Sequence, residues 1–179
     1  LCITCRSWCE FMTNKIKIIK CRVEDVNSYV KMLWLGLAEE MFKAEHFIIP
    51  SEANGDKWVR FVREGLASGR NLLLVAKNKE GLVGFAFASV PREYPMDVVE
   101  SVGRINDVYV QPKFRRKGIG TKLIVECLNR IKTRGINNVR LTVLTENRAR
   151  QIYMKNLILE STSMKSVSYT HLRAHETGR

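Results

Sequence analysis

The sequence has few prolines and no long uninterrupted apolar segment. Only four of its 179 residues are proline, and no apolar run approaches the roughly 18 residues that cross a membrane. Internal repeats and low-complexity tracts are also absent from the sequence. A membrane-spanning protein and a repeat protein are therefore excluded. A hydrophobic content of 45% in a chain of this length predicts one domain around a single core.

Cysteine is scarce beyond residue 11, because three of the five cysteines lie in residues 1–11. Their spacing is compatible with metal ligation, but no histidine and no second pair of ligands lies near them. We therefore expect no metal site, and we interpret residues 1–11 as a non-native or upstream extension ahead of Met12. The remaining Cys21 and Cys127 form no disulfide framework, which is typical of a reducing, cytoplasmic compartment.

Histidine is rarer still, and two of the three histidines, His171 and His175, lie in the segment VSYTHLRAHET near the C-terminus. This segment resembles the one-frame translation of a widely used sequencing-library adapter. We expect residues 167–179 to be an adapter-derived tail and exclude the histidine pair from metal or catalytic roles. A single domain over residues 12–166 remains.

Acidic residues are outnumbered: 30 Lys and Arg against 18 Asp and Glu give a formal net charge of +12. Such a balance indicates either a nucleic acid or a strongly anionic small ligand. The two ends contribute almost no net charge, so the excess belongs to residues 12–166. Lys and Arg are spread along the chain without the interleaved aromatic residues of a nucleic-acid surface, so nucleic acid is the less favoured partner.

Hydrophobic periodicity predicts an α/β fold. We expect Asp25 and Asp56 to begin the first two helices, and Gly84 inside an apolar strand to mark a bulge or a close backbone approach. Two nearly continuous apolar runs, residues 71–77 and 82–90, indicate strands covered on both faces. The further strands are expected at residues 15–21, 105–110, 138–145 and 157–165, and the later helices at 119–132 and 147–156.

Large side chains on the predicted helices indicate the core. Trp34, Trp58 and Phe61 are expected to be buried there as packing residues. Cys127 lies on the apolar face of the helix that begins at Ile119, so we expect it to pack in the core instead of acting as a nucleophile.

The most informative stretch is residues 105–121, INDVYVQPKFRRKGIGT. It predicts a buried strand, a proline turn, a basic glycine loop and the start of a helix. Glycines at a helix N-terminus expose backbone N–H groups that bind phosphate. The order Arg115-x-x-Gly118-x-Gly120 is more specific than glycine richness alone.

A second motif follows at residues 147–155, NRARQIYMK. Together the two motifs resemble those of the Gcn5-related N-acetyltransferases (GNAT), whose second motif is Asn-x-x-Ala-x-x-x-Tyr-x-Lys-x-Gly-Phe. Ala149, Tyr153 and Lys155 match it, whereas Asn147 stands one residue closer to the alanine than usual. Leu-Ile at residues 157–158 replaces Gly-Phe. The resemblance covers residues 15–165.

The resemblance implies a GNAT-like acyl-CoA N-acyltransferase fold, with a mixed, mostly antiparallel sheet flanked by helices in the order β-α-α-β-β-β-α-β-α-β. It implies acetyl-CoA as co-substrate, no metal, and Tyr153 as the acid that protonates the departing thiolate. It also implies a cofactor-binding set in three groups: the strand residues Val108, Tyr109 and Val110; the loop residues Arg115, Arg116, Lys117, Gly118, Ile119, Gly120 and Thr121; and Asn147.

The general base is left open by the sequence. Asp107 resembles the acidic position that faces the amine in polyamine acetyltransferases, but a side chain there could equally bond a neighbouring strand. Glu93 and Asp97 are weaker candidates, and a water relay would need no single base.

The predicted activity is acetyl transfer from acetyl-CoA to a primary amine by direct attack in a ternary complex. The competing hypotheses are a non-catalytic acyl-CoA-sensing module and a basic nucleic-acid-binding module. The sequence identifies no particular amine, which could be a small molecule or a protein amine, and does not decide whether the chain forms a homodimer.

Overall fold

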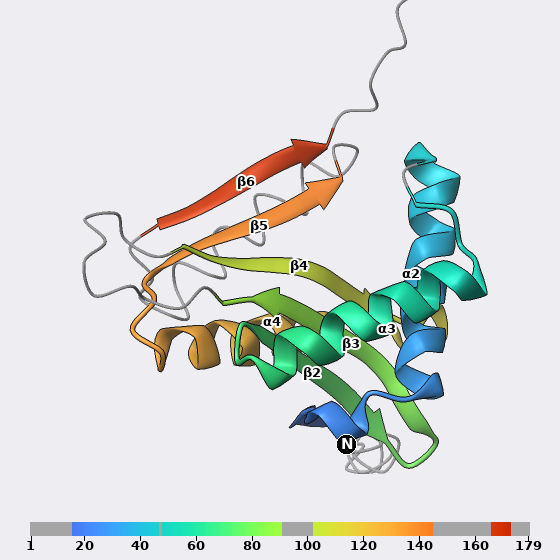
Figure 1. The fold of residues 1–179 in the computed structure, drawn as a ribbon, viewed down its shortest axis with the longest axis horizontal. Coiled ribbons are helices and arrows are strands. Elements are labelled where there is room, and N and C mark those ends of the chain that lie inside the picture. The colour runs from blue at the N-terminus through green and yellow to red at the C-terminus, as the bar shows by residue number, and fades with distance from the viewer. Residues whose placement is uncertain (1–15, 47, 91–101, 145–165, 173–179) are drawn as a thin grey trace, which may run out of the picture.

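The computed structural model describes residues 16–46, 48–90, 102–144 and 166–172. These residues form one sheet and its covering helices (Figure 1). Three helices are described: α2 (Ser28–Glu45), α3 (Glu52–Ala67) and α4 (Ile119–Lys132), together with the single 3-10 turns η1 (Val23–Asp25) and η2 (Pro112–Phe114). The strands are β1 (Lys17–Lys20), β2 (Asn71–Asn78), β3 (Gly81–Ser89), β4 (Val102–Val110), β5 (Asn138–Leu144) and β6 (Ser166–Leu172).

The six described strands follow one another in the sheet in chain order. β1 to β4 are paired antiparallel, whereas the β4–β5 and β5–β6 pairs are parallel. A short turn suffices between antiparallel strands, but β4 and β5 need the crossover helix α4. The predicted α/β fold with a mixed, mostly antiparallel sheet is confirmed.

Helices cover both faces of the sheet. α4 lies on one face, against alternate apolar residues of β2, β3 and β4, while α2 and α3 lie on the other (Figure 1). Leu72 and Leu74 accordingly point to α4, and Leu73 and Val75 to α2 and α3. Because side chains alternate along a strand, two covered faces require the continuous apolar runs seen in the sequence. Cys127 is completely buried under the sheet, as predicted.

The first two helices begin at other residues than predicted. α2 is capped by Asn27, whose Oδ1 accepts from the N–H of Tyr29 (3.0 Å), while Asp25 closes the preceding turn by accepting from the N–H of Arg22 (2.8 Å). α3 begins one turn before Asp56, with Ser51 as its cap. All of these residues are good caps, so local sequence alone does not choose among them.

The predicted core is confirmed for two of the three aromatic residues. Trp34 and Trp58 are buried and stacked, with ring centroids 5.5 Å apart. Phe61 is 55% exposed, so its predicted burial is wrong. It lies at the border of α3, where its ring meets the edge of Phe87 with centroids 5.9 Å apart.

Gly84 confirms the prediction of a close backbone approach. A Cβ at this position would lie 2.6 Å from the carbonyl oxygen of Tyr109 on the neighbouring strand. The β2–β3 register also shifts beside it, between Ala76 and Lys77. A side chain larger than hydrogen would therefore force β3 and β4 apart.

The C-terminal strand differs from the expectation. Residues 166–172 pair with β5, although the sequence interpretation excluded residues 167–179 from the fold. Val167, Tyr169 and Thr170 have a high preference for strands, and β5 offers a parallel edge. The adapter origin of this segment stays a prediction. The helix expected at 147–156 and the strand expected at 157–165 lie outside the described residues, as do residues 1–11.

Candidate active site

β4 leaves the neighbouring strand halfway along its length. Residues 102–105 pair with residues 138–141 of β5, and beyond them the two strands diverge (Figure 1). On its other side β4 stays paired with β3 up to Val110, with one extra residue, Asn106, between the pairs Ala88–Ile105 and Phe87–Asp107. A bulge of this kind bends a strand and re-aims its side chains. The second half of β4, which holds the predicted residues Val108, Tyr109 and Val110, thus has one edge free of the described part of β5.

The glycine loop follows directly from this half-paired strand. The turn η2 ends at Phe114, which is buried, and the chain then passes through two left-handed residues, Arg116 (φ 62°) and Gly118 (φ 74°). α4 begins at Ile119 with no side chain capping its first turn. Its free N–H groups and the helix dipole make this end a favourable place for an anion.

The two glycines of the loop differ in backbone conformation and in surroundings. Gly118 has open space around it, but its left-handed backbone is strained for any residue with a Cβ. Gly120 has an ordinary helical backbone, and an added Cβ would meet only Val110 Cγ2, at 3.9 Å. A methyl group therefore fits at Gly120, while a long or acidic side chain would project into the first turn of α4. Ile119 is buried and Thr121 is half-buried, so these two contribute backbone.

The basic side chains of the loop separate into two groups. Arg116 and Lys117 are exposed, with Lys117 Nζ 5.7 Å from the centroid of the Phe114 ring. Arg115 instead turns inward: its Nε donates to the carbonyl oxygen of Val110 (2.7 Å) and its Nη2 binds Glu40 of α2. The sequence predicted one phosphate-binding group for Arg115, Arg116 and Lys117; the last two are exposed, whereas the Arg115 side chain is 37% exposed and contacts Val110 and Glu40.

Asp107 lies on the face of the sheet that α2 and α3 cover. It is opposite Phe87 and two residues before Tyr109, both of which pack on that face. Burial raises the pKa of Asp107 from an ordinary 3.8 to about 6, and the indole N–H of Trp58 partly offsets this rise. That N–H is buried and makes no hydrogen bond of standard geometry within the described residues. The Asp107 carboxyl and the Trp58 indole N–H are thus two neighbouring polar groups on a face that is lined by aromatic side chains.

Tyr109 is a residue whose side chain the sequence did not single out. It is buried, and its hydroxyl lies so close to α2 that a Cβ on Gly36 would be 2.6 Å from it. The guanidinium carbon of Arg115 lies 5.6 Å from the centroid of its ring. Burial, followed by the nearby charge of Glu40, raises the pKa of the Tyr109 hydroxyl. A glycine facing an aromatic residue across two elements has no local signal, so only the tertiary structure identifies this contact.

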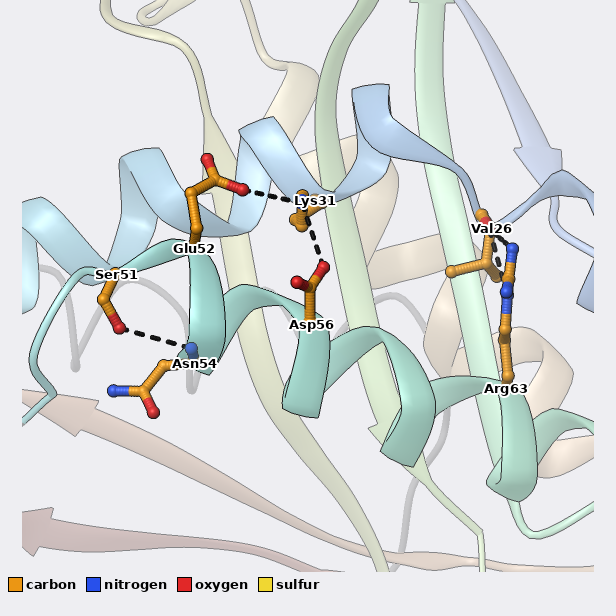
Figure 2. A network of polar contacts seen from close by, with 7 residues as sticks. All are labelled: Val26, Lys31, Ser51, Glu52, Asn54, Asp56 and Arg63. Carbon is orange, nitrogen blue, oxygen red and sulfur yellow. Dashed lines mark hydrogen bonds and ion pairs between the residues drawn. The ribbon is translucent and has the colours of Figure 1, made fainter.

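Polar contacts connect α3 with α2 and with the segment just before α2 (Figure 2). Lys31 Nζ of α2 lies 2.7 Å from Glu52 and 2.9 Å from Asp56, both on α3. Arg63 of α3 donates from Nη2 to the carbonyl oxygen of Val26 (2.6 Å) at the other end of the helix pair. These contacts hold α3 at two points, one before and one after Trp58 in the helix, against α2 and against the residue that follows η1.

Four predicted residues cannot be placed in this site. Asn147 and Tyr153, and the alternative bases Glu93 and Asp97, lie outside the described residues. Their roles stay predictions.

The mixed sheet, the half-paired and bulged strand β4, the left-handed glycine loop and the uncapped helix agree with the acyltransferase fold that the sequence motifs resemble. Residues 35–157 match the model of the acetyltransferase (GNAT) family, and the chain belongs to this family. The proposed resemblance is thereby confirmed.

Individual relatives are more distant. An L-2,4-diaminobutyric acid acetyltransferase of Halalkalibacterium halodurans is 34% identical over 95 residues, which are 53% of this chain and 48% of the relative. The chain thus matches about half the length of this curated relative.

Solved structures share the fold. A possible acetyltransferase from Clostridium difficile 630 superposes with a TM-score of 0.63 at 20% identity, over 92% of this chain and 99% of that one. A predicted acetyltransferase from Clostridium acetobutylicum, solved with acetyl-CoA, has a TM-score of 0.59 at 17% identity, over 79% and 88% of the two chains.

Two features are absent from the described residues. None of their helices is both long and apolar enough to cross a membrane. Nor do three or more His, Cys, Asp or Glu side chains within these ranges gather in a way that could hold a metal ion.

Proposed function

We propose that this chain transfers an acetyl group from acetyl-CoA to a primary amine by direct attack within a ternary complex. The observation that carries the proposal is the position of a half-buried carboxyl with a raised pKa, Asp107, on the half-paired strand that leads into an uncapped, left-handed glycine loop. An anion site and a proton acceptor on one short segment are what acyl transfer from an anionic thioester to an ammonium requires.

The glycine loop is the proposed site of the cofactor diphosphate. Backbone N–H groups of Gly118, Ile119, Gly120 and Thr121 would bind the phosphate oxygens, and Arg116 would add positive charge from its exposed position. The free edge of β4 at Val108, Tyr109 and Val110 would align the pantetheine arm and the thioester carbonyl. A solved structure of the same fold contains acetyl-CoA, which supports the identity of this ligand.

Asp107 is the proposed proton acceptor. It takes a proton from the substrate ammonium, the free amine forms a bond to the acetyl carbon, and the carbon–sulfur bond breaks. Tyr153 then protonates the departing thiolate, and the nitrogen gives its second proton to the resulting tyrosinate. Asp107 releases its proton to solvent, so that an amide, free coenzyme A and one proton result. A carboxyl with a pKa of about 6 is a stronger base than an ordinary aspartate and is still mostly ionised near pH 7.

The acceptor is proposed to be a small primary amine. The relative named for L-2,4-diaminobutyric acid supports this class, since that compound is a small molecule with primary amino groups. A carboxyl beside the aromatic rings of Trp58 and Phe87 also suits an ammonium carried on a short apolar chain.

We further propose that the enzyme works in a reducing compartment such as the cytoplasm. Cys21 and Cys127, the cysteines among the described residues, are both buried and unpaired, as such a compartment favours.

The test is acetyl-CoA turnover, followed by thiol release, with a panel of amines that includes L-2,4-diaminobutyrate, polyamines, aminoglycosides and a peptide N-terminus. We expect amide formation with at least one small amine. Gly120→Glu should abolish acetyl-CoA binding measured by calorimetry, whereas Gly120→Ala should retain it. Tyr153→Phe should retain binding and mainly lower kcat. Absence of acetyl-CoA binding by the unaltered protein would refute the proposal, and binding without turnover on any amine would favour an acyl-CoA sensor.

A further inference from the structure

Arg115 occupies the first position of the glycine motif, yet its half-buried side chain contacts β4 and α2. Three contacts hold it: the carbonyl oxygen of Val110 (2.7 Å from Nε), the carboxylate of Glu40, and the ring of Tyr109 (5.6 Å from the guanidinium carbon to the centroid). The guanidinium group thus donates a hydrogen bond to a carbonyl oxygen, pairs with a carboxylate and lies near an aromatic ring. Such a set of contacts orients a side chain more closely than a single surface ion pair does.

These contacts limit what else Arg115 can bind. A paired grip on a phosphate uses two parallel N–H groups from neighbouring nitrogens of the guanidinium. Nε is committed to Val110 and Nη2 to Glu40, so this paired edge is already engaged. To grip a diphosphate through this edge, Arg115 would have to give up both partners, whereas a grip through Nη1 and the second N–H of Nη2 would leave these two contacts in place.

The loop has other cations for a phosphate. Arg116 is exposed, and its left-handed backbone (φ 62°) turns the chain immediately before Lys117 and Gly118. Lys117 is exposed as well. The anion site therefore keeps positive charge and free backbone N–H groups without any contribution from Arg115.

The residues that Arg115 contacts belong instead to the elements that surround Asp107, the proposed proton acceptor. Glu40 lies on α2, which packs on the same face of the sheet as Asp107, and Tyr109 is two residues beyond Asp107 on β4. Val110 is the last residue of β4 before the loop. Arg115 is thus the link between the end of β4 and the helix that covers it.

We propose that Arg115 is a positioning residue that fixes β4 and Tyr109 against α2 for the acceptor amine, and not a ligand of the cofactor phosphates. This inference rests on the proposed function, since it assigns a role within that reaction. It departs from the phosphate-binding role that the motif implied for Arg115.

The close contact between Tyr109 and α2 explains why such a link matters. At Gly36 the helix leaves no room for even a methyl group in front of the Tyr109 hydroxyl. A small shift of α2 relative to β4 would therefore displace Tyr109 and, through the strand, Asp107. The Arg115–Glu40 contact connects α2 to the loop after β4 and so opposes that shift.

The test compares Arg115→Gln, Arg115→Lys and Glu40→Gln with the neighbouring Arg116→Gln as the matched control. Acetyl-CoA affinity is measured by calorimetry, and kcat and KM for the amine are measured separately. We expect the Arg115 and Glu40 variants to bind acetyl-CoA within about threefold of the unaltered protein and to lose about tenfold or more in kcat/KM for the amine. Arg116→Gln should weaken acetyl-CoA binding, by about tenfold. Lysine should not rescue the loss at position 115, because it cannot bond Val110 and Glu40 together.

The opposite pattern would overturn the inference. If Arg115→Gln weakens acetyl-CoA binding about tenfold, Arg115→Lys restores it and Glu40→Gln leaves it unchanged, then Arg115 is a phosphate ligand. A double-mutant cycle on the free energy of unfolding needs no ligand, so it separates this inference from the proposed function. Coupling between Arg115 and Glu40 supports the link even if no amine is acetylated, and additive effects of the two substitutions refute it.

Discussion

Replacing Asp107 with asparagine should stabilise the protein in a manner that depends on pH. Burial raises the pKa of this carboxyl from 3.8 to about 6, which is a shift of roughly two units. At about 1.4 kcal/mol per unit, ionising Asp107 in the folded protein costs on the order of 3 kcal/mol. The folded pKa is the higher one, so stability is fully present below pH 3.8 and is lost as the pH rises through about 6. Asparagine has the same shape and carries no charge at any pH.

The gain from Asp107→Asn should therefore be small near pH 4, and it should grow to a value approaching 3 kcal/mol near pH 8, both as order-of-magnitude figures. The assay is reversible denaturant unfolding of both proteins at several pH values, with the midpoint and the slope reported for each. Glu64→Gln is a suitable control, because Glu64 is exposed on α3 and its substitution should change stability little at any of these values.

A gain that is equal at both ends of the pH range would refute the reasoning, because it would come from packing and not from the buried charge. The pH dependence of kcat/KM provides an independent test of the ionisation of Asp107. In the unaltered enzyme kcat/KM for the amine should rise with pH through about 6, and this limb should be missing from Asp107→Asn. A variant that is stabilised at high pH and inactive would indicate that stability is sacrificed for a base at this position.

Further predictions concern the residues around this carboxyl and the loop. Trp58→Phe removes an N–H that lowers the pKa of Asp107, so the acid limb of kcat/KM should move to higher pH; a limb that stays in place would remove Trp58 from this role. Gly118→Ala should destabilise the protein by about 1–2 kcal/mol in denaturant unfolding, because alanine is strained at φ 74°, and an unchanged midpoint would contradict the assigned backbone. Gly36→Ala should cost about 1–3 kcal/mol, since its methyl group would collide with the Tyr109 hydroxyl. Tyr109→Phe should recover part of that loss, and failure to recover any would argue against this contact.

Much of the fold could be predicted from local patterns. The apolar runs at β2 and β3 predicted a sheet covered on both faces, and the spacing of apolar residues in α4 predicted which side of the helix is buried. These predictions hold because a strand or helix repeats its orientation at a fixed period, whatever lies against it. The starts of α2 and α3 were predicted less well, since Asp25, Asn27, Ser51 and Asp56 are all competent caps. Packing decided among them, and Asp56 came to bind Lys31 on the other helix instead.

The site divides in the same way. The glycine order and the basic residues of the loop predicted an anion site, because the conformational freedom of glycine and the charge of lysine and arginine belong to the residues themselves. The direction in which the Arg115 side chain points, by contrast, is not a property of the residue itself. It depends on Glu40, which is far away in the chain and is brought to the loop by α2.

By itself, therefore, the sequence determined the family and the layered sheet and predicted a place for an anion, all of which follow from short-range order along the chain. The tertiary structure decided which side chains meet: Asp107 with Trp58, Tyr109 with Gly36, and Arg115 with Glu40. The physical reason is that the pKa of a carboxyl and the partners of a guanidinium depend on burial and on neighbours from other elements. Those neighbours become adjacent only when helices and sheet pack together.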